Sequence, residues 1–273
     1  MTGKIPTVDY EKVMNTDEGL YEWLNNIRIY GLGTVSGVPV TEEATKKTIE
    51  RIGPIRDTHY GAFWAFTSGF AHGDLAYSTL EIPAHTDTTY FNDPAGLQLF
   101  HLLEEAGVGG EQFYVDGFAA AEILKKEDPE AHKILSEARV YGYQAGDENV
   151  FLKPTAQPYP LLNYNNKGEL YQIRFNNEDR YIINNLKFDM VPKYYNALRK
   201  WMEIVRRPES ELVLALKPGT LIAIDNWRVM HARKSFKGGR TLSGGYVDTD
   251  YWKSKYRVVS FRAKGKDCKA ELL

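Results

Sequence analysis

The chain has 273 residues, of which 43% are hydrophobic and 26% charged, a balance typical of a folded protein and not of a disordered or fibrous one. Its 34 Lys and Arg residues nearly balance 36 Asp and Glu residues, so charge gives no reason to expect nucleic acid or an anionic membrane as a partner, and a small neutral or zwitterionic ligand fits better. The single cysteine, Cys268, rules out a disulfide framework within the chain and a zinc site built on thiolates.

The first predicted elements are a helix, a short strand and a second helix. Apolar residues recur at helical spacing from Leu20 to Ile27, ahead of a break at Gly31. Thr41 is placed to cap the second helix, and Gly53 begins the Gly-Pro pair that ends it. We expect these helices to serve as scaffold.

The middle of the chain changes to strand-like patterns. A helix is expected from Phe118, and a longer one with one apolar face over residues 191–205, ending before Pro208. The predicted strands of this part cover residues 96–103, 112–115, 140–143, 149–152 and 170–175.

The last third returns to strands, expected over residues 212–216, 221–224 and 241–247. Many short strands separated by Gly and Pro turns favour a mainly β fold with flanking helices around a double-stranded β-helix, or jelly-roll, core. No repeat or composition shift marks a second domain. The predicted organisation is therefore a single domain over residues 1–273, with residues 1–55 as an N-terminal helical addition.

A candidate metal site combines two distant motifs. His85 and Asp87 are two residues apart, so in an extended segment both side chains project from one face and can reach the same ion. His231 could supply a third ligand, which would complete the two-histidine, one-carboxylate set of non-haem iron(II) oxygenases, with positions left open for a 2-oxo acid and dioxygen. Alone, the His-x-Asp pair is a weak signal, and a hydrogen-bonded surface pair, a zinc hydrolase site or a structural metal site remain alternatives.

Two arginines follow the second histidine. Arg240 lies nine residues after His231, across a Gly-Gly turn, and is placed for a bidentate grip on the far carboxylate of a dicarboxylic co-substrate. Arg233 is a second candidate for that carboxylate. Singly, each is more often a solvated surface charge, so the prediction depends on their combination with the metal set.

The chain resembles the 2-oxoglutarate oxygenases over most of its length, and within them the trimethyllysine dioxygenase and γ-butyrobetaine hydroxylase branch. Three strings carry the resemblance: HTDTTYF at 85–91, GLQLFH at 96–101 and DNWRVMH at 225–231. Ala232 departs from the glycine usual after the metal histidine, a change we expect to be tolerated. The resemblance implies iron ligands and a 2-oxoglutarate anchor, namely His85, Asp87 and His231 for the metal and Arg240, with Arg233, for the anchor.

A quaternary ammonium has no hydrogen to donate, so proteins recognise it with aromatic faces. Tyr60 and Trp64 are four residues apart, as on one side of a helical turn, and Tyr77 precedes the metal motif. Gly244 is expected to leave room for a ligand beside Tyr246. With 18 tyrosines and 5 tryptophans, each aromatic residue could equally be core, but the resemblance implies that these four form a trimethylammonium cage.

Two polar residues are candidates for the opposite end of the substrate. Asp74 stands where the butyrobetaine enzymes have an amide, so a charge-assisted contact to an α-ammonium group is a reasonable hypothesis. Asn176 is similar to the amide that would hold the α-carboxylate or the ammonium. An ordinary polar loop residue is the alternative at both positions.

The resemblance implies iron(II)- and 2-oxoglutarate-dependent hydroxylation of N6-trimethyllysine at C3, a step of carnitine biosynthesis, with succinate and CO2 as co-products. Iron(II), 2-oxoglutarate as co-substrate and dioxygen are the expected cofactors, with ascorbate as reductant. Hydroxylation of γ-butyrobetaine or another small amine is the alternative within this chemistry. Fuller family members carry an extra N-terminal domain that would support a dimer, so a homodimer stays open.

The expected location is cytoplasmic. Residues 1–9 lack the apolar core of a secretory signal and the Arg-rich pattern of a mitochondrial leader, and no later run is long and apolar enough to span a bilayer. A mitochondrial location is the alternative if the natural chain starts earlier.

Overall fold

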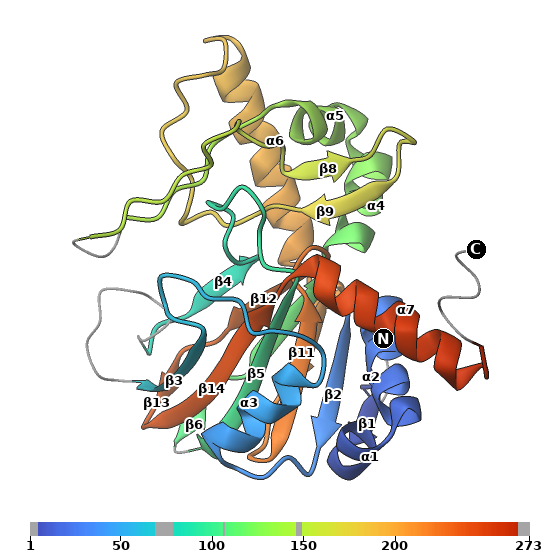
Figure 1. Ribbon diagram of the computed structural model, residues 1–273. Coiled ribbons are helices and arrows are strands. Elements are labelled where there is room, and N and C mark those ends of the chain that lie inside the picture. Colours follow the sequence, from blue (N-terminus) through green and yellow to red (C-terminus); the bar gives the residue numbers. More distant parts are fainter. Residues whose placement is uncertain (1–4, 69–78, 106, 146–148, 267–273) are drawn as a thin grey trace.

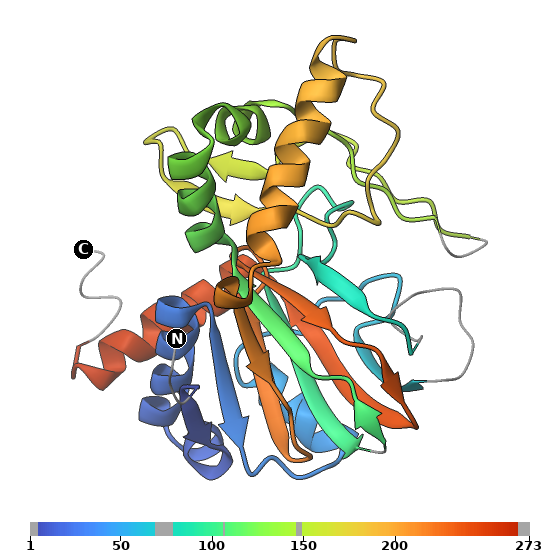
Figure 2. The ribbon, with the colours of Figure 1, turned by 180° about the vertical axis from the view of Figure 1, so that it is seen from behind.

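The computed structural model describes residues 5–68, 79–105, 107–145 and 149–266. Two β-sheets form the centre of the molecule, helices cover the outer face of the larger sheet, and a further helical layer sits above one end of both (Figures 1 and 2). This double-sheet core confirms the predicted mainly β jelly roll with flanking helices. The division into a single domain with a separate N-terminal addition stays a prediction.

The larger sheet has six described strands, and all its neighbours are antiparallel except the first two. Across the sheet these are β1 (Thr7–Asp9), β2 (Leu32–Ser36), β11 (Thr220–Asp225), β5 (Leu97–Glu105), β14 (Arg240–Val247) and β3 (Phe63–Ser68).

The smaller sheet packs against the larger one and supplies two of the candidate metal ligands. Its strands, in order, are β10 (Glu211–Leu214), β7 (Gln112–Asp116), β12 (Val229–Arg233) and β4 (Ile82–His85). Two short antiparallel pairs lie outside both sheets: β6 (Val108–Gly109) with β13 (Phe236–Lys237), and β8 (Leu162–Tyr164) with β9 (Leu170–Ile173).

Alternate residues of the central strands face opposite sides of the larger sheet, as strand geometry requires. Phe100 and Ile222 pack between the two sheets together with Tyr114 of β7. Leu99 and Ala223 face outward into a second core. The helices that cover this outer core are α1 (Tyr10–Asn15), α2 (Asp17–Tyr30), α3 (Glu42–Glu50) and α7 (Thr249–Ala263).

Local signals explain where the first helices begin and end. The Thr16 side chain accepts a hydrogen bond from the Gly19 amide at the start of α2, and Gly31 ends that helix with a φ of 78°, in the left-handed region. Thr41 caps α3 as predicted, by accepting from the Ala44 amide. The predicted helices of this region are therefore confirmed.

The upper layer combines three helices with the β8–β9 hairpin around Trp201, which is fully buried. Its elements are α4 (Gly117–Glu127), α5 (Pro129–Glu137), α6 (Met190–Val205) and the short 3-10 helix η2 (Pro208–Ser210). The predicted long helix is α6, which ends at Val205 before Pro208.

The strands predicted over residues 140–143 and 149–152 were wrong. Within the described residues, this region makes only isolated bridges, from Val140 to Tyr159, from Gly142 to Arg180 and from Gln144 to Leu152. Because successive residues pair with different segments, no ladder of hydrogen bonds builds up.

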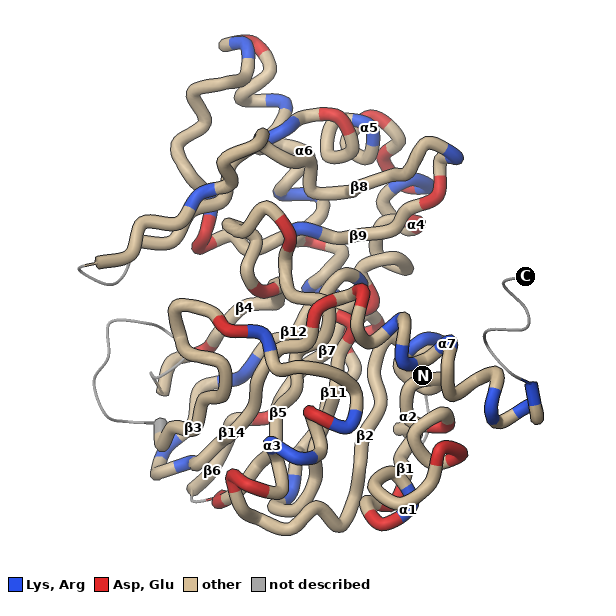
Figure 3. Tube along the Cα trace, in the orientation of Figure 1, with Lys and Arg blue, Asp and Glu red and all other residues tan. Residues whose placement is uncertain are grey.

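The distribution of charged residues agrees with the near-neutral balance of the sequence. Basic and acidic residues both occur in each layer of the fold (Figure 3). Among the helices of the described chain, none has the length and apolar character that crossing a bilayer would need.

Candidate metal centre

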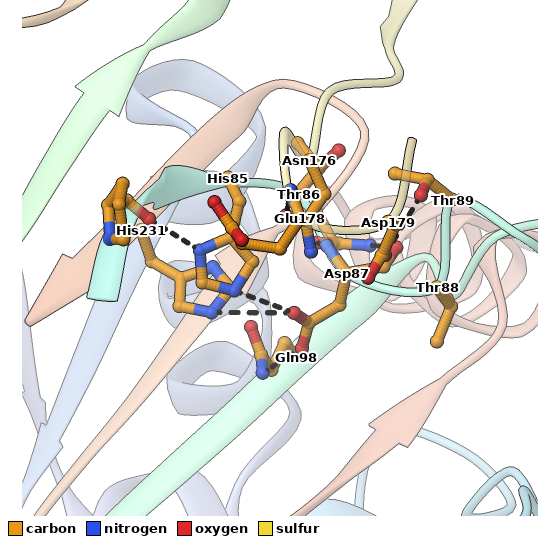
Figure 4. A network of polar contacts seen from close by, with 12 residues as sticks. His85, Thr86, Asp87, Thr88, Thr89, Gln98, Asn176, Glu178, Asp179 and His231 are labelled. Atoms are coloured by element: carbon orange, nitrogen blue, oxygen red, sulfur yellow. Dashed lines mark hydrogen bonds and ion pairs between the residues drawn. The ribbon is translucent and has the colours of Figure 1, made fainter. Parts of the chain in front are cut away.

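Strand register brings the two candidate histidines together. His85 is the last residue of β4, and His231 lies directly opposite it on β12. Asp87 follows in a bend, because Thr86 leaves the β4 ladder and instead hydrogen-bonds the backbone of Phe175. The predicted extended geometry thus holds for the first ligand of the motif but not for Asp87, whose side chain nevertheless points at the histidines (Figure 4).

The three side chains offer ligand atoms that all lie within 4.8 Å of one another. The Nε2 atoms of His85 and His231 are 3.1 Å and 3.6 Å from Asp87 Oδ1. His85 Nδ1 is 2.7 Å from the carbonyl oxygen of Pro83, a contact that turns Nε2 towards the centre. All three side chains are 13–15% exposed, so the cluster is sheltered yet reachable.

Electrostatics puts two of these groups, Asp87 and His231, in the form that binds a metal ion. Burial alone would raise the pKa of Asp87, but His231, His85 and the Tyr246 hydroxyl lower it to about 2. Burial, together with the charge of His85, lowers the pKa of His231 to about 3. At neutral pH Asp87 is therefore anionic and His231 neutral, and the donor set fits iron(II) with open positions.

Asn226 joins the two motifs through the backbone of Asp87. The Asp87 amide donates to Asn226 Oδ1 at 2.8 Å, and Asn226 Nδ2 donates to the carbonyl oxygens of Asp87 at 3.1 Å and Ala95 at 2.9 Å. Asn226 is 1% exposed. The DNWRVMH motif contains Asn226, but its sequence gives no sign of this role, which depends on the contact between two distant segments.

The two predicted arginines are buried close to this centre. Arg240 is 6% exposed and donates to the carbonyl oxygen of Gly110 at 3.1 Å, and within the described chain it has no ion-paired carboxylate. Arg233 is 7% exposed, and burial together with the charge of Arg240 lowers its pKa to about 10. Arg240 also acts electrostatically on Tyr114, which pairs with His231 across β7 and β12. A dicarboxylate placed here would compensate a buried positive charge.

Two expectations about the aromatic residues were wrong. Tyr60 lies in a turn and Trp64 in β3, so they do not share a helical turn, because Trp64 pairs with Gly244 of β14. The space beside Gly244 is also filled. A Cβ there would lie 2.4 Å from the Trp64 indole, so the ring and not a ligand occupies this position.

Aromatic side chains nevertheless form a series of ring contacts that reaches the metal centre. The rings of Trp64 and Phe100 are 5.4 Å apart, and those of Phe100 and His231 are 5.6 Å apart. Tyr246 donates to Asp87 Oδ2 at 2.7 Å, and Tyr60 lies near enough to contribute to raising the pKa of Tyr246. The structure therefore brings three of the four predicted cage residues to one region. Tyr77 and Asp74 lie outside the described residues.

The segment after β9 approaches the centre from the upper layer. Asn176 Oδ1 accepts from the Glu178 amide at 3.0 Å, and Asp179 accepts from the Thr89 hydroxyl at 3.0 Å (Figure 4). Asn176 and Asp179 line the same small cavity, and the charge of Asp179 contributes to raising the pKa of His85. Sequence reasoning missed Asp179, whose only signal is its place in the same loop as Asn176.

Arg174 fixes the segment that follows Asp87. Arg174 is 9% exposed as a residue, and its guanidinium donates to the carbonyl oxygens of Thr89, Phe91 and Asn92. The centroid of the Tyr159 ring lies 3.8 Å from the guanidinium carbon in a cation–π contact. This cluster ties the metal-binding loop to the upper layer.

The family model and the similar proteins of known name are all dioxygenases. A model of the taurine catabolism dioxygenase TauD, TfdA family matches residues 2–246. Trimethyllysine dioxygenase, mitochondrial, of Mus musculus is 43% identical over 268 residues, which cover 95% of this chain and 62% of the mouse protein. Gamma-butyrobetaine dioxygenase of Homo sapiens is 30% identical over 265 residues, which cover 96% of this chain and 68% of that protein. This chain thus spans 62% of the length of the mouse trimethyllysine dioxygenase.

Solved structures share the fold. A taurine dioxygenase from Burkholderia xenovorans superposes with a TM-score of 0.65 at 13% identity, covering 90% of this chain and 88% of that one. Asparagine oxygenase, in complex with Fe(II), (2S,3S)-3-hydroxyasparagine and succinate, gives a TM-score of 0.66 at 14% identity, covering 88% and 83%. At these identities the likeness concerns the fold alone.

Proposed function

This chain belongs to the taurine catabolism dioxygenase TauD, TfdA family, and from that premise we propose that it is an iron(II)- and 2-oxoglutarate-dependent dioxygenase that hydroxylates N6-trimethyllysine at C3. The observation that carries the proposal is the convergence of His85, Asp87 and His231 on one point. Arg240 on β14 is buried as well and is available to a co-substrate carboxylate. Trimethyllysine dioxygenases at 39–43% identity support this substrate over γ-butyrobetaine, whose dioxygenase is 30% identical.

The protein's part in the reaction is to hold the metal ion and both substrates. When bound, iron(II) with 2-oxoglutarate and dioxygen supplies the oxidation, in which 2-oxoglutarate gives succinate and CO2 and the substrate gains a hydroxyl group. His85, Asp87 and His231 would hold the ion, and its remaining coordination positions would be available to 2-oxoglutarate and dioxygen. Arg240, assisted by Arg233, binds the carboxylate of 2-oxoglutarate that is remote from the metal.

The aromatic residues position the trimethylammonium end of the substrate. Tyr60, Trp64 and Tyr246 present rings near the centre, and Tyr77 is the predicted fourth member. Such positioning matters because a carbon atom must be held close to the metal centre for oxidation to be selective.

The polar segment 174–180 fits the amino-acid end of the substrate. Asn176 offers an amide to the α-carboxylate, and Asp179 offers a carboxylate to the α-ammonium group. Asp74 stays a prediction for the same ammonium group. A substrate such as γ-butyrobetaine, which has no α-ammonium, would gain nothing from either acid.

Other predictions remain open. A zinc hydrolase would leave Arg240 and the aromatic residues without a role, so it is the weaker reading. The mouse relative is named a mitochondrial protein, whereas the cytoplasmic location expected for this chain stays a prediction. Ascorbate as reductant and a homodimer are likewise predictions.

The test is succinate formation by the iron(II)-loaded protein with trimethyllysine, γ-butyrobetaine and unmethylated lysine. We expect 2-oxoglutarate turnover to be fastest with trimethyllysine and a hydroxylated product to appear by mass spectrometry. If γ-butyrobetaine is turned over faster, it and not trimethyllysine is the substrate. If the protein forms no succinate with iron(II) but hydrolyses a substrate with zinc, the proposed oxygenase activity is wrong.

A further inference from the structure

Two buried residues on neighbouring strands reach the same oxygen atom of the metal-binding carboxylate. Gln98 of β5 and Tyr246 of β14 are cross-strand partners, 3% and 5% exposed. Tyr246 donates its hydroxyl hydrogen to Asp87 Oδ2 at 2.7 Å, and Gln98 Nε2 donates to the same atom. Because strand register sets this pairing, both donors are held by the larger sheet, whereas the histidines belong to the smaller one.

The two oxygens of Asp87 therefore have different surroundings. Oδ1 faces the Nε2 atoms of His85 and His231, at 3.1 Å and 3.6 Å. Oδ2 already accepts two hydrogen bonds, which engage the lone pairs that a second bond to the metal ion would need. The carboxylate is thus prepared to bind through one oxygen.

The orientation of the Gln98 side-chain amide indicates that its NH2 group, and not its oxygen, is needed beside Asp87. Its Oε1 atom is buried and has no hydrogen-bond partner among the residues that the structure describes. Leaving a buried acceptor without a partner is unfavourable. The reversed amide would place a carbonyl oxygen against the Asp87 carboxylate, so the observed orientation follows from the contact with Asp87.

Resting on the proposed function, we propose that Gln98 and Tyr246 are positioning residues that restrict Asp87 to one metal-binding oxygen. Tyr246 thereby also links the other predicted cage residues, Tyr60 and Trp64, to the metal centre. The ring and the hydroxyl of Tyr246 then have separable roles. The ring faces the trimethylammonium group, and the hydroxyl holds the metal ligand.

Two variants test this inference. Tyr246→Phe keeps the ring and removes one oxygen atom, and Gln98→Met keeps the length of the side chain and removes the amide. Two control variants make the same changes at buried positions outside the described metal centre: Tyr194→Phe in α6 and Gln172→Met in β9, at residues that are each 4% exposed. Mn(II) affinity is measured by calorimetry with 2-oxoglutarate present and no amine substrate.

We expect both test variants to bind Mn(II) about 10- to 100-fold more weakly, the usual effect of removing a hydrogen bond to a metal ligand, and both controls to bind as the parent does. In turnover, Tyr246→Phe should lower kcat and leave the KM of the amine substrate within about twofold, whereas Tyr246→Leu, which lacks the ring, should also raise that KM.

Unchanged Mn(II) affinity in Tyr246→Phe overturns the inference, and so does an equal loss in the matched controls. Thermal unfolding of the metal-free variants identifies any that fail to fold, and Tyr246→Phe decides the question if Gln98→Met is one of them. The Mn(II) measurement needs no turnover. If the parent protein oxidises no trimethyllysine, the proposed substrate fails while weakened Mn(II) binding still supports the positioning role.

Discussion

A buried guanidinium is stable only when its charge is compensated, and Arg240 lacks an ion-paired carboxylate among the described residues. We therefore expect Arg240→Gln to raise the dissociation constant of 2-oxoglutarate about 30-fold or more, as truncation of a buried charge pair costs about 2–5 kcal/mol. Arg262→Gln, which alters an exposed arginine paired with Asp17, is the control. Calorimetry with Mn(II)-loaded protein measures both. Equal affinities in the parent and Arg240→Gln would place 2-oxoglutarate elsewhere.

A second prediction at this scale concerns the amino-acid end of the substrate. Asp179→Asn should lower kcat/KM for trimethyllysine about 10-fold or more, because a hydrogen bond to a charged group is worth about 1.5–3 kcal/mol. The same change should have little effect on any residual turnover of γ-butyrobetaine, which has no α-ammonium. Glu178→Gln serves as the neighbouring control. An equal loss with both substrates would argue for a structural role of Asp179 and leave the ammonium group to Asp74.

Single residues differ in how well sequence predicts them. His85, Asp87 and His231 could be found because their types and spacing match a known donor set. Gln98 and Asn226 could not, since an amide has no signature of its own, and its role follows from which strand or bend lies opposite. For the same reason, the spacing of Tyr60 and Trp64 indicated a helical turn that the pairing of β3 with β14 excludes.

At the scale of elements, a buried polar cluster joins α3 to the larger sheet. Thr45 of α3 contacts His101 Nδ1 of β5 at 2.7 Å and the Ser243 hydroxyl of β14 at 2.9 Å. All three residues are 0% exposed. Burial lowers the pKa of His101 from 6.5 to about 4, so the ring is neutral in the folded protein at neutral pH.

This cluster should make the fold sensitive to acid. Because the pKa of His101 is lower in the folded than in the unfolded chain, its contribution is present above about pH 6.5 and is lost as the pH falls towards 4. We expect about 2 kcal/mol less stability at pH 5 than at pH 7.5 from this group alone. Urea unfolding at both pH values should show a smaller difference for His101→Gln than for the parent protein. An identical difference in both would contradict the prediction.

Elements with local signals were predictable from the sequence, and elements that depend on a distant partner were less so. Caps and apolar spacing indicated α2, α3 and α6, because a helix satisfies its own backbone. Residues 140–143 have the composition of a strand, but the fold offers them no single partner strand. The jelly roll itself was predictable from the number of short strands, whereas the order of those strands was not.

At the scale of the whole molecule, the metal ion would add a further connection between parts that strand pairing and hydrogen bonds already hold together. It would join β4, β12 and the bend at Asp87, which Asn226 and Arg174 tie to the rest of the fold. Ligands that bind only the folded state stabilise it, by about 2.7 kcal/mol at a concentration 100 times the dissociation constant.

We therefore expect Mn(II) with 2-oxoglutarate to raise the thermal midpoint of the metal-free protein by about 5–10 °C, and EDTA to reverse the change. Differential scanning fluorimetry gives the measurement. The His231→Ala variant, which lacks one ligand, should show no such rise. A rise of the same size in that variant would mean that the ion binds at another place.

The residues of the site lie on two kinds of backbone, paired strands and connecting segments. His85, His231 and Arg240 stand on strands, while Tyr60, Asn176 and Asp179 stand on connecting segments. Connections tolerate replacement better than paired strands do. Grafting residues 176–180 from a relative with another acceptor should therefore change which amine is bound while leaving Arg174, Phe175 and the strands that carry the two histidines in place, which makes this scaffold a practical starting point for altered selectivity.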